Sequence, residues 1–404
     1  MKAPSVSPAS ASRVYFFESH PVQYKAPVYQ ALQRILPDSF EVIYATDASL
    51  RKGNVDVEFG TEVVWDTPLM CGYPFRVLNN ENGVPLRSPK SLTGRGIFSL
   101  LFRDRPPAVV ITHFRYRFDQ AAYLAALALR IPILIRQETQ DAMFAAKRSW
   151  LKNGVRSITY RALYSPIQHA FAFGVLNHQH LRRHGVRPEC ISFARFSVPD
   201  PFETMAATEM VQLRRDVRNH LQIPDGKLLV AFVGKFIPQK APHLLFDSVK
   251  FLPREVQNRL HLVLVGSGKL LDLLKSAAQE VETLFGVRST FTGFVNQSQL
   301  PGQYLAADII ALPSPFEAWG LVINEALNAG CAAIVSKSVG CQHEFSGLER
   351  MRVIETGDAR QLARAIAELA RFPRNFLWAR PHMKQYSSVA AARAIADRIQ
   401  MFLK

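Results

Sequence analysis

The chain has 404 residues, more than the ~250–300 at which a single hydrophobic core stops growing, so we expect at least two domains. With 48% hydrophobic and 20% charged residues, the composition excludes wholesale disorder. The formal net charge of +16 favours an anionic partner, and three classes fit: nucleic acid, an acidic membrane surface and a phosphorylated substrate.

The sequence shows no segment typical of membrane insertion or export. The longest apolar run, residues 121–129, is shorter than the ~18–20 residues that span a bilayer. Residues 1–12 form a Pro/Ser/Ala-rich tail without an apolar stretch. The four cysteines lie far apart and form no C-x-x-C pair. We therefore expect a cytoplasmic location, reduced thiols, and neither a transmembrane helix nor a cysteine zinc site.

Short β-branched or aromatic runs alternate with longer helical patterns, which predicts βα units that build parallel sheets. In the first half, helices are expected at 25–36 and 119–130. The strands expected in that half are 14–17, 40–44, 108–112, 133–135 and 170–173. The strands expected in the second half are 228–233, 262–265, 290–293, 308–312 and 332–336. Each half therefore predicts a doubly wound α/β domain.

Turn signals suggest where the domains begin and end. Two prolines near residue 200 mark a connection between the two series of strands. We expect a flexible tail at 1–12, a first Rossmann-like domain at 13–199 and a second at 200–381. A C-terminal helix is expected at 382–404. It could belong to the second domain, or it could pack back on the first domain.

Two lysines follow the first predicted strand of the second half. Gly234 and Lys235 come directly after the strand, and Lys240 follows a proline turn. Two ammonium groups at the carboxyl end of a strand can converge on one phosphate, where each acts as a strongly hydrated point charge. Two solvated surface lysines are the alternative, and this segment alone does not decide between them.

A glycine-rich turn follows the next strand, with Gly266 and Gly268 on either side of a serine. The third glycine of a nicotinamide-binding G-x-G-x-x-G is missing, because Leu271 stands there. The segment also argues against a P-loop, because the Ser or Thr after Lys269 and the earlier glycine of that motif are missing. We therefore expect a tight strand-to-helix turn near a ligand.

The most informative segment is residues 313–330, which follow the predicted strand at 308–312 and enter a helix near Gly320. In open α/β sheets ligands bind at the carboxyl ends of strands, and a helix N-terminus there offers unpaired N–H groups to an anion. Glu317 lies in the loop and Glu325 within the helix, so both carboxylates can accept hydrogen bonds from one bound molecule. Two solvated acids are the alternative, and the loop-then-helix context favours the ligand site.

The first half carries two further candidate features. His20 and His113 each end or follow a predicted strand, and both a ligand role and a structural role are open for them. Residues 142–188 contain eight Lys or Arg and no Asp or Glu. This basic segment either faces an anionic partner or forms a solvated surface.

Together these motifs resemble the retaining glycosyltransferases of family 4, which have the GT-B fold of two Rossmann-like domains facing across a cleft. Residues 233–240 are similar to their phosphate-binding G-[RK]-x₄-K segment, 291–295 to their base-side loop, and 317–325 to their E-x₇-E motif. In the first half, residues 20–24 are similar to one subset of the family, whose members are often encoded for surface polysaccharide assembly.

The resemblance implies a role for each candidate residue. It assigns Lys235 and Lys240 to the donor diphosphate and Glu317 to sugar hydroxyls. Glu325 would contact the nucleotide ribose, and His113 would lie near the transferred sugar. The other positions implied to bind the donor are His20, Gly234, Gly266, Phe294, Val295, Gly320, Leu321 and Val322.

We therefore expect an enzyme that moves a sugar from a nucleoside-diphosphate sugar to a hydroxyl with retention of configuration, as a hexosyltransferase does. Preorganised lysines and a helix end would stabilise the leaving diphosphate, so no metal or other cofactor is expected. Residues 56–58, Asp-Val-Glu, resemble the D-x-D that holds a metal in other sugar transferases, but they lie in a charged, surface-like stretch.

The expected acceptor is a saccharide or a lipid-linked saccharide, with the basic segment at 142–188 docked on the anionic inner face of the cytoplasmic membrane. A nucleic-acid-binding or scaffold protein with an inactive GT-B shell is one alternative function. A sugar-nucleotide epimerase is another. No recognition-helix or RNA-binding signature appears, so nucleic acid is not an expected partner.

Overall fold

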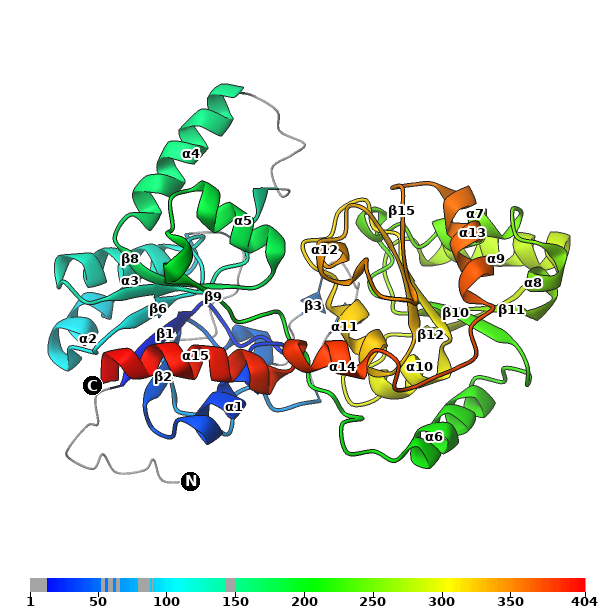
Figure 1. The fold of residues 1–404 in the computed structure, drawn as a ribbon, viewed down its shortest axis with the longest axis horizontal. Helices are drawn as coiled ribbons and strands as arrows, with labels where there is room; N and C mark the ends of the chain where they lie inside the picture. The colour runs from blue at the N-terminus through cyan, green and yellow to red at the C-terminus, as the bar shows by residue number, and fades with distance from the viewer. Residues whose placement is uncertain are drawn as a thin grey trace. The chain divides into compact units, whose positions relative to one another are not determined.

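The computed structural model describes residues 13–51, 55–56, 61–62, 66–78, 88, 90–141 and 150–403. The chain divides into two compact units, each built on a parallel sheet (Figure 1). The first unit comprises Met1–Arg51, Pro68–Phe196 and Ser388–Lys404, and the second comprises Lys52–Thr67 and Ser197–Ser387. The expected fold class, α/β with two Rossmann-like domains, is confirmed.

Residues 52–67 group with the second unit, although they lie within the domain expected at 13–199. Asp66 accepts a hydrogen bond from the backbone N–H of Ser298, at 3.2 Å, and this contact ties the excursion to the second unit. Within this range β3 (Val55–Asp56) pairs with β4 (Thr61–Glu62) in antiparallel fashion. A long-range polar contact of this kind leaves no signal in local composition.

The sheet of the first unit has the strand order β5-β2-β1-β6-β7-β8-β9, and every pair is parallel. Its strands are β1 (Val14–Glu18), β2 (Phe40–Tyr44), β5 (Phe75–Val77), β6 (Val109–Ile111), β7 (Ile133–Ile135), β8 (Ile167–Ala172) and β9 (Ile191–Phe193). Strands β1, β2, β6 and β7 are buried along their whole length. Burial on both faces explains why these strands are mostly hydrophobic, with Glu18 and Glu41 as the charged exceptions, rather than alternating patterns.

The helices of the first unit come from its N-terminal segments and from the C-terminal segment Ser388–Lys404. They are α1 (Ala26–Ile35), α2 (Ile97–Asp104), α3 (Arg117–Ala128), α4 (Trp150–Tyr164), α5 (Val175–Arg183) and α15 (Ser388–Leu403), with short 3-10 turns η1 (Ala48–Leu50) and η3 (Pro188–Cys190). The C-terminal helix α15 packs against α1 (Figure 1). It begins at Ser388 rather than at 382, because the preceding Tyr386 is held in the second unit by a 2.6 Å hydrogen bond to Glu344.

The sheet of the second unit has the order β12-β11-β10-β13-β14-β15 and is also parallel throughout. Its strands are β10 (Leu228–Val233), β11 (Leu260–Val265), β12 (Arg288–Gly293), β13 (Ile309–Leu312), β14 (Ala332–Ser336) and β15 (Met351–Ile354). Its helices are α6 (Ala207–His220), α7 (Leu244–Val249), α8 (Arg254–Arg259), α9 (Leu271–Phe285), α10 (Leu300–Ala306), α11 (Leu321–Asn328), α12 (Gln342–Phe345), α13 (Ala359–Leu369) and α14 (Arg380–Met383), with 3-10 turns η4 (Pro238–Lys240) and η5 (Lys384–Tyr386).

Both sheets have a point at which the strand order reverses. In the second unit β11 and β12 extend to one side of β10, and β13, β14 and β15 extend to the other. In the first unit the corresponding neighbours are β1 and β6. Open α/β sheets bind ligands outside the carboxyl ends of the strands at such a switch point. The loops after β10 and β13, and after β1 and β6, are therefore the places to look for function.

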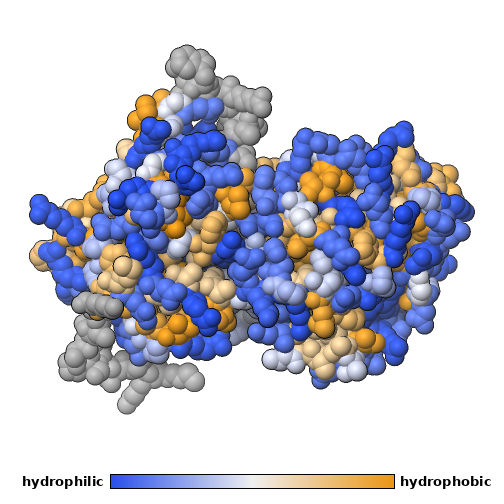
Figure 2. Space-filling model, viewed as in Figure 1, coloured by the Kyte–Doolittle hydropathy of each residue, from blue (hydrophilic) through white to orange (hydrophobic). Residues whose placement is uncertain are grey.

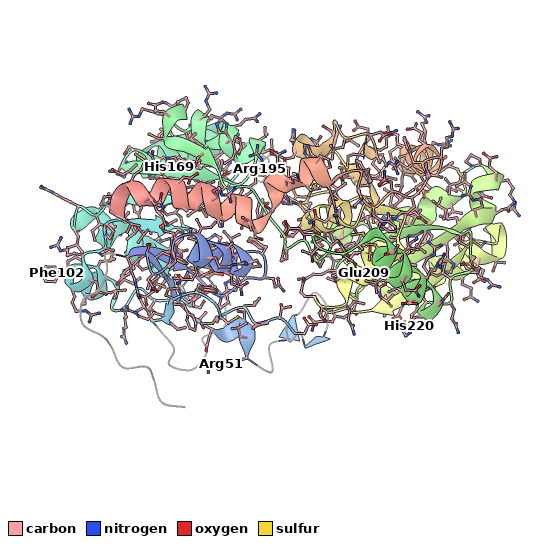
Figure 3. All side chains as sticks on the ribbon, turned by 60° about the horizontal axis from the view of Figure 1, so that its bottom comes forward. Arg51, Phe102, His169, Arg195, Glu209 and His220 are labelled. Atoms are coloured by element: carbon pink, nitrogen blue, oxygen red, sulfur yellow. The ribbon has the colours of Figure 1, made fainter. Side chains whose placement is uncertain are left out.

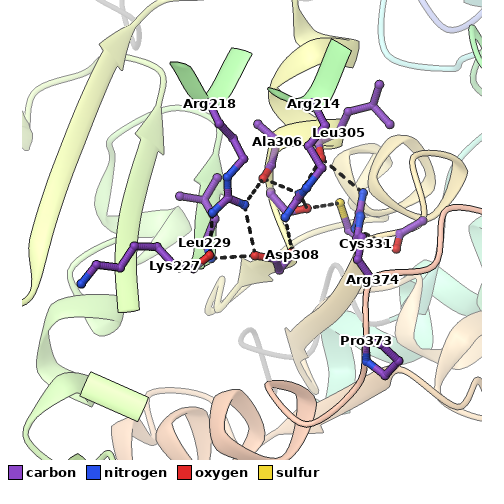
Figure 4. A network of polar contacts seen from close by, with 12 residues as sticks. Arg214, Arg218, Lys227, Leu229, Leu305, Ala306, Asp308, Cys331, Pro373 and Arg374 are labelled. Carbon is purple, nitrogen blue, oxygen red and sulfur yellow. Dashed lines mark hydrogen bonds and ion pairs between the residues drawn. The ribbon is translucent and has the colours of Figure 1, made fainter. Parts of the chain in front are cut away.

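The opposite, amino-terminal edge of the second sheet is held by an arginine network (Figure 4). Asp308, directly before β13, accepts hydrogen bonds from Arg214 at 2.6 Å and from the backbone N–H of Leu229 at 2.8 Å. Arg218 lies 3.4 Å from the same carboxylate. Both arginines belong to α6, so this network attaches that helix to the sheet.

Hydrophilic residues cover most of the molecular face shown in Figure 2, with apolar groups scattered among them. Some large apolar side chains of the first unit are exposed, and Phe102 of α2 is 58% exposed at the surface (Figure 3). No helix in the described ranges combines the length and the apolar character needed to cross a bilayer.

Candidate functional site

Lys240 and Glu317 meet at the switch point of the second sheet. Lys240 ends the turn η4 after β10, and Glu317 lies in the loop after β13. Their side chains form an ion pair although 77 residues separate them in the chain. The Lys240 side chain is 26% exposed and the Glu317 side chain 19%, so neither is fully buried. This contact brings together two motifs that the sequence only suggested to be neighbours.

The loop after β10 is fixed by the glycine turn after β11. The backbone N–H of Gly234 donates to Val265 O at 2.9 Å, and that of Phe236 donates to Ser267 O at 2.8 Å. A Cβ on Gly266 would lie only 1.9 Å from the carbonyl oxygen of Gly234. The two backbones therefore touch at a place where only glycine fits. The expected tight turn is present, and its backbone hydrogen bonds hold the loop after β10, which carries Lys235 and Lys240, in place.

The loop that carries Glu317 is fixed in the same way by the segment after β14. The backbone N–H of Glu317 donates to Ser338 O at 3.2 Å, and Gly340 N–H donates back to Glu317 O at 2.9 Å. A Cβ on Gly340 would lie 2.0 Å from the carbonyl oxygen of Ala318. Cross-strand pairing of this kind leaves the loop little freedom, so the carboxylate is preorganised.

Helix α11 begins directly after this loop, at the carboxyl edge of the sheet. Gly320 adopts φ +99°, where a Cβ would press on Leu312 at 2.9 Å, and the helix proper starts at Leu321. The first backbone N–H groups of an α-helix, here those of Leu321 and Val322, have no intrahelical acceptor and carry partial positive charge. The edge with the Lys240 ammonium group thus also carries a helix N-terminus.

Glu325 lies on α11 but contacts a different partner from Glu317. Its carboxylate accepts a hydrogen bond from the Tyr304 hydroxyl of α10. Burial raises the pKa of Glu325 to about 7, while the Tyr304 hydrogen bond opposes that shift. The structure thus places the two glutamates of the E-x₇-E motif against different neighbours, Lys240 and Tyr304, which lets them address separate parts of one ligand.

The remaining predicted positions of the second unit also lie at the carboxyl edge of its sheet. Lys235 is half-buried and follows Gly234 directly after β10. Phe294 and Val295, both half-buried, follow β12, and Gly293 O accepts a hydrogen bond from Gly266 N–H at 2.8 Å. The loops after β10, β11 and β12 are therefore linked in a row by backbone hydrogen bonds.

The two predicted histidines lie at the switch point of the first sheet. His113 follows β6, and the Nζ atom of buried Lys25 lies 3.2 Å from its Nε2. Burial, assisted by the Lys25 charge, lowers the pKa of His113 to about 3. His20 follows β1, and burial lowers its pKa to about 4. Both imidazoles are thus neutral near pH 7, as hydrogen-bonding groups rather than charges.

A buried network behind these histidines was not anticipated from the sequence. Glu18, at the end of β1, receives hydrogen bonds from Lys25 at 2.8 Å, from Thr112 at 2.8 Å and from Tyr29. Burial by itself would raise the pKa of Glu18, but the Lys25 and His113 neighbours outweigh it and lower the pKa. The only sequence signal is an acid at the end of an otherwise apolar strand.

The metal candidate suggested by the sequence, residues 56–58, lies largely outside the described residues, as do residues 142–149 of the basic segment. Within the described part of the second unit, no three His, Cys, Asp or Glu side chains converge on a possible ion. The polar groups observed at its carboxyl edge are those suited to a phosphorylated, hydroxyl-bearing ligand.

Comparisons with known proteins agree with this geometry. Residues 214–385 match the family model "Glycosyl transferases group 1". An uncharacterized glycosyltransferase of Methanocaldococcus jannaschii is 33% identical over 138 residues, which is 32% of this chain and 34% of the relative. A GDP-mannose-dependent alpha-(1-6)-phosphatidylinositol monomannoside mannosyltransferase of Mycobacterium tuberculosis is 27% identical over 56% of this chain and 57% of its own length. The matched region thus spans about a third to just over half of these curated relatives.

Solved structures extend the likeness over nearly the whole chain, at the level of the fold. HepE of Anabaena in complex with UDP-glucose superposes with a TM-score of 0.66 at 15% identity, and covers 96% of this chain and 99% of its own. Sucrose-phosphate synthase of Thermosynechococcus elongatus gives a TM-score of 0.66 at 17% identity, over 96% and 98% of the two chains. Residues 214–385 are therefore similar to the glycosyl transferases group 1, and the two Rossmann-like units of the chain have the GT-B fold.

Proposed function

We propose that this protein transfers a sugar from a nucleoside-diphosphate sugar to a hydroxyl acceptor, with retention of configuration and without a metal ion at the donor site. The observation that carries the proposal is the Lys240–Glu317 pair at the switch point of the second sheet. It joins a cation suited to a diphosphate and a carboxylate suited to sugar hydroxyls at one point. The group 1 family match and the UDP-glucose complex of the HepE neighbour support the same ligand class.

The difficult chemical step is departure of the nucleoside diphosphate, because negative charge builds up on its terminal phosphate. Lys235, Lys240 and the N-terminus of α11 are preorganised positive groups at the edge where that charge would develop. Removing one preorganised group of this kind typically costs ~10²–10³ in rate, or about 2.7–4 kcal/mol. Such groups do the work that a divalent ion does in many phosphoryl-transfer sites.

In the proposed cycle the diphosphate binds beside Lys240, which stays close to Glu317. The Glu317 carboxylate accepts hydrogen bonds from hydroxyls of the transferred sugar, and Glu325 accepts those of the nucleotide ribose. Phe294 and Val295 contact the base, and Gly234, Gly266 and Gly320 let the backbone approach the phosphates. The acceptor hydroxyl attacks on the face that the diphosphate leaves, and a donor phosphate oxygen takes the acceptor's proton. No covalent enzyme intermediate is part of this cycle.

The first unit contributes neutral hydrogen-bonding groups. We assign His113 to recognition of the transferred sugar and His20 to the donor. The Lys25 ammonium group donates to Nε2 of neutral His113, so that the ring is held in one orientation. A neutral imidazole can recognise hydroxyl groups without attracting a second anion.

We further propose a saccharide or lipid-linked saccharide as the acceptor, in surface polysaccharide assembly, with peripheral attachment to the inner face of the cytoplasmic membrane. The mycobacterial relative is named for a phosphatidylinositol-linked acceptor. In this chain, Val155 and Ile158 of α4 are 65% and 70% exposed, and exposed Lys152 and half-buried Arg156 lie on the same helix. Exposed apolar and basic side chains on one helix suit an anionic lipid surface.

The donor proposal is tested by nucleotide binding. Thermal unfolding should shift upward with UDP, GDP or ADP, because a ligand that binds only the folded state stabilises it. Slow hydrolysis of one sugar nucleotide in a panel would then name the donor. Stabilisation by oligonucleotides alone would instead support a nucleic-acid-binding protein, and conversion of donor to its epimer without acceptor would identify an epimerase.

The membrane proposal is tested by sedimentation with vesicles at low salt. Binding to vesicles that contain phosphatidylglycerol, and its loss in Ile158→Glu, is the expected outcome. Equal failure of the wild type to bind neutral and anionic vesicles would indicate a soluble acceptor, and would leave the donor proposal standing.

A further inference from the structure

We propose that Asp141, His180 and His184 of the first unit bind a zinc ion. One potential ligand atom from each residue lies within 4.8 Å of the others. His180 lies on α5 and His184 caps its C-terminus, so their four-residue spacing places both imidazoles on one face of the helix. Asp141 comes from the segment that follows β7.

The distances between these atoms are close to those of a zinc site. Oδ1 of Asp141 lies 2.8 Å from Nδ1 of His180 and 3.4 Å from Nε2 of His184. Ligands of a tetrahedral zinc ion, at bond lengths of about 2.0–2.2 Å, are separated from one another by roughly 3.3 Å. To admit an ion, Oδ1 of Asp141 would have to move about half an ångström away from Nδ1 of His180, whereas its distance from Nε2 of His184 already fits.

The far nitrogen of each imidazole already has a partner, as the histidine ligands of metals usually do. Nε2 of His180 lies 3.1 Å from the Tyr164 hydroxyl, which also receives a hydrogen bond from Gln137. Nδ1 of His184 lies 3.4 Å from the Ser157 hydroxyl. With zinc on Nδ1, the His180 proton would reside on Nε2 and be donated to the Tyr164 oxygen.

Helix α4 fixes the orientation of both rings. Tyr160 packs edge-on against His180, with ring centroids 4.7 Å apart, and against His184 at 5.2 Å. The imidazoles are buried, whereas the Asp141 side chain is 35% exposed, so a water molecule can complete the coordination from the solvent side. Three protein ligands and one open position are a common zinc arrangement.

A cluster held together by hydrogen bonds alone is the competing explanation. Arg183 also pairs with Asp141, at 2.8 Å, but its side chain is 68% exposed and is free to turn into solvent. Two buried imidazoles aimed at the same carboxylate oxygen are better explained by a shared cation. Two imidazoles and one carboxylate favour zinc over magnesium, which prefers oxygen ligands and keeps several waters. The ion would clamp the segment after β7 to α5.

The experiment is equilibrium dialysis of the untagged full chain against buffered Zn²⁺, with the bound metal counted by inductively coupled plasma mass spectrometry. We expect one zinc per chain in the wild type. Asp141→Asn and His184→Gln should each weaken binding by more than ~100-fold, since even the loss of an outer partner costs 10–100-fold. His178→Gln is the matched control, because His178 lies on the same helix, stacked on Phe193, outside the cluster.

Folding is monitored separately by circular dichroism, and the Co²⁺ absorption spectrum reports the ligand set independently. A tetrahedral Co²⁺ spectrum in the wild type and in His178→Gln, lost in Asp141→Asn, would support the site. Zinc binding that is equal in the wild type, Asp141→Asn and His184→Gln, or absent from the folded wild type, would overturn it. No donor or acceptor is present in these measurements, so their outcome is independent of the proposed transferase activity.

Discussion

Replacement of Lys240 by alanine probes the donor edge most simply. The change removes the ammonium group that pairs with Glu317 and that we assign to the leaving diphosphate. If that assignment is right, the substitution deletes one preorganised positive group from the transition state. The expected loss is then ~10²–10³ in turnover, or about 2.7–4 kcal/mol of transition-state stabilisation.

The effect of Lys240→Ala on stability should be much smaller. Both partners of the ion pair are partly exposed, at 26% and 19%, and such pairs contribute at most about 1 kcal/mol. The free energy of unfolding, measured with urea, should therefore fall only slightly. A large loss of turnover with nearly unchanged stability separates a chemical role from a structural one.

Lys337→Ala is the matched control. Lys337 forms an ion pair with Glu355 in the same unit, with side chains 57% and 54% exposed. Steady-state turnover of the control, on the donor found in the nucleotide panel, should equal that of the wild type. If Lys240→Ala also turned over at a near-normal rate, the diphosphate role of this lysine would be refuted.

Three further predictions concern the second unit. Burial raises the pKa of Glu325 from its ordinary value of 4.5 to about 7. The folded state therefore holds this proton more tightly than the unfolded state, and the free energy of unfolding of the wild type should fall as pH rises from 4.5 to about 7. Glu325→Gln should flatten this dependence on pH. An unchanged pH dependence in the variant would contradict the prediction. Gly266→Ala should lower the free energy of unfolding, measured with urea, by about 3 kcal/mol or more, because its Cβ would collide with the Gly234 carbonyl oxygen. Gly286→Ala, where a Cβ meets nothing within 4 Å, should lower it by only about 1 kcal/mol. Equal losses in the two variants would refute the argument from close approach. Asp308→Asn should lower the free energy of unfolding by about 3–5 kcal/mol, because the guanidinium groups of Arg214 and Arg218 lose their carboxylate partner. A loss below about 1 kcal/mol would show that the network in Figure 4 is not needed for stability.

Much of the fold was predictable because most residues of each buried strand are apolar and turn residues bound the strand. The strands expected at 40–44, 133–135, 228–233 and 332–336 coincide with β2, β7, β10 and β14. Short or partly exposed strands were missed. Phe75–Val77 and Met351–Ile354 lie at or near sheet edges, where one side is exposed and the hydrophobic signal is weak.

The candidate site was predictable as a set of loops, because parallel strands bring their carboxyl ends to one edge. The pairing of individual side chains was not, since the contacts of Lys240 with Glu317 and of Tyr304 with Glu325 join residues far apart in the chain. The Asp141–His180–His184 cluster was overlooked for the same reason. Its histidines have ligand spacing on one helix, but the third member lies 39 residues from the nearer of them.

The central claim is that a diphosphate binds where the loops after β10 and β13 meet. Hydrogen–deuterium exchange with and without a saturating nucleoside diphosphate would locate that ligand on the chain. We predict slower exchange in the backbone amides of residues 234–240 and 317–323. Saturated binding that leaves both segments unchanged, and protects amides elsewhere, would contradict the account.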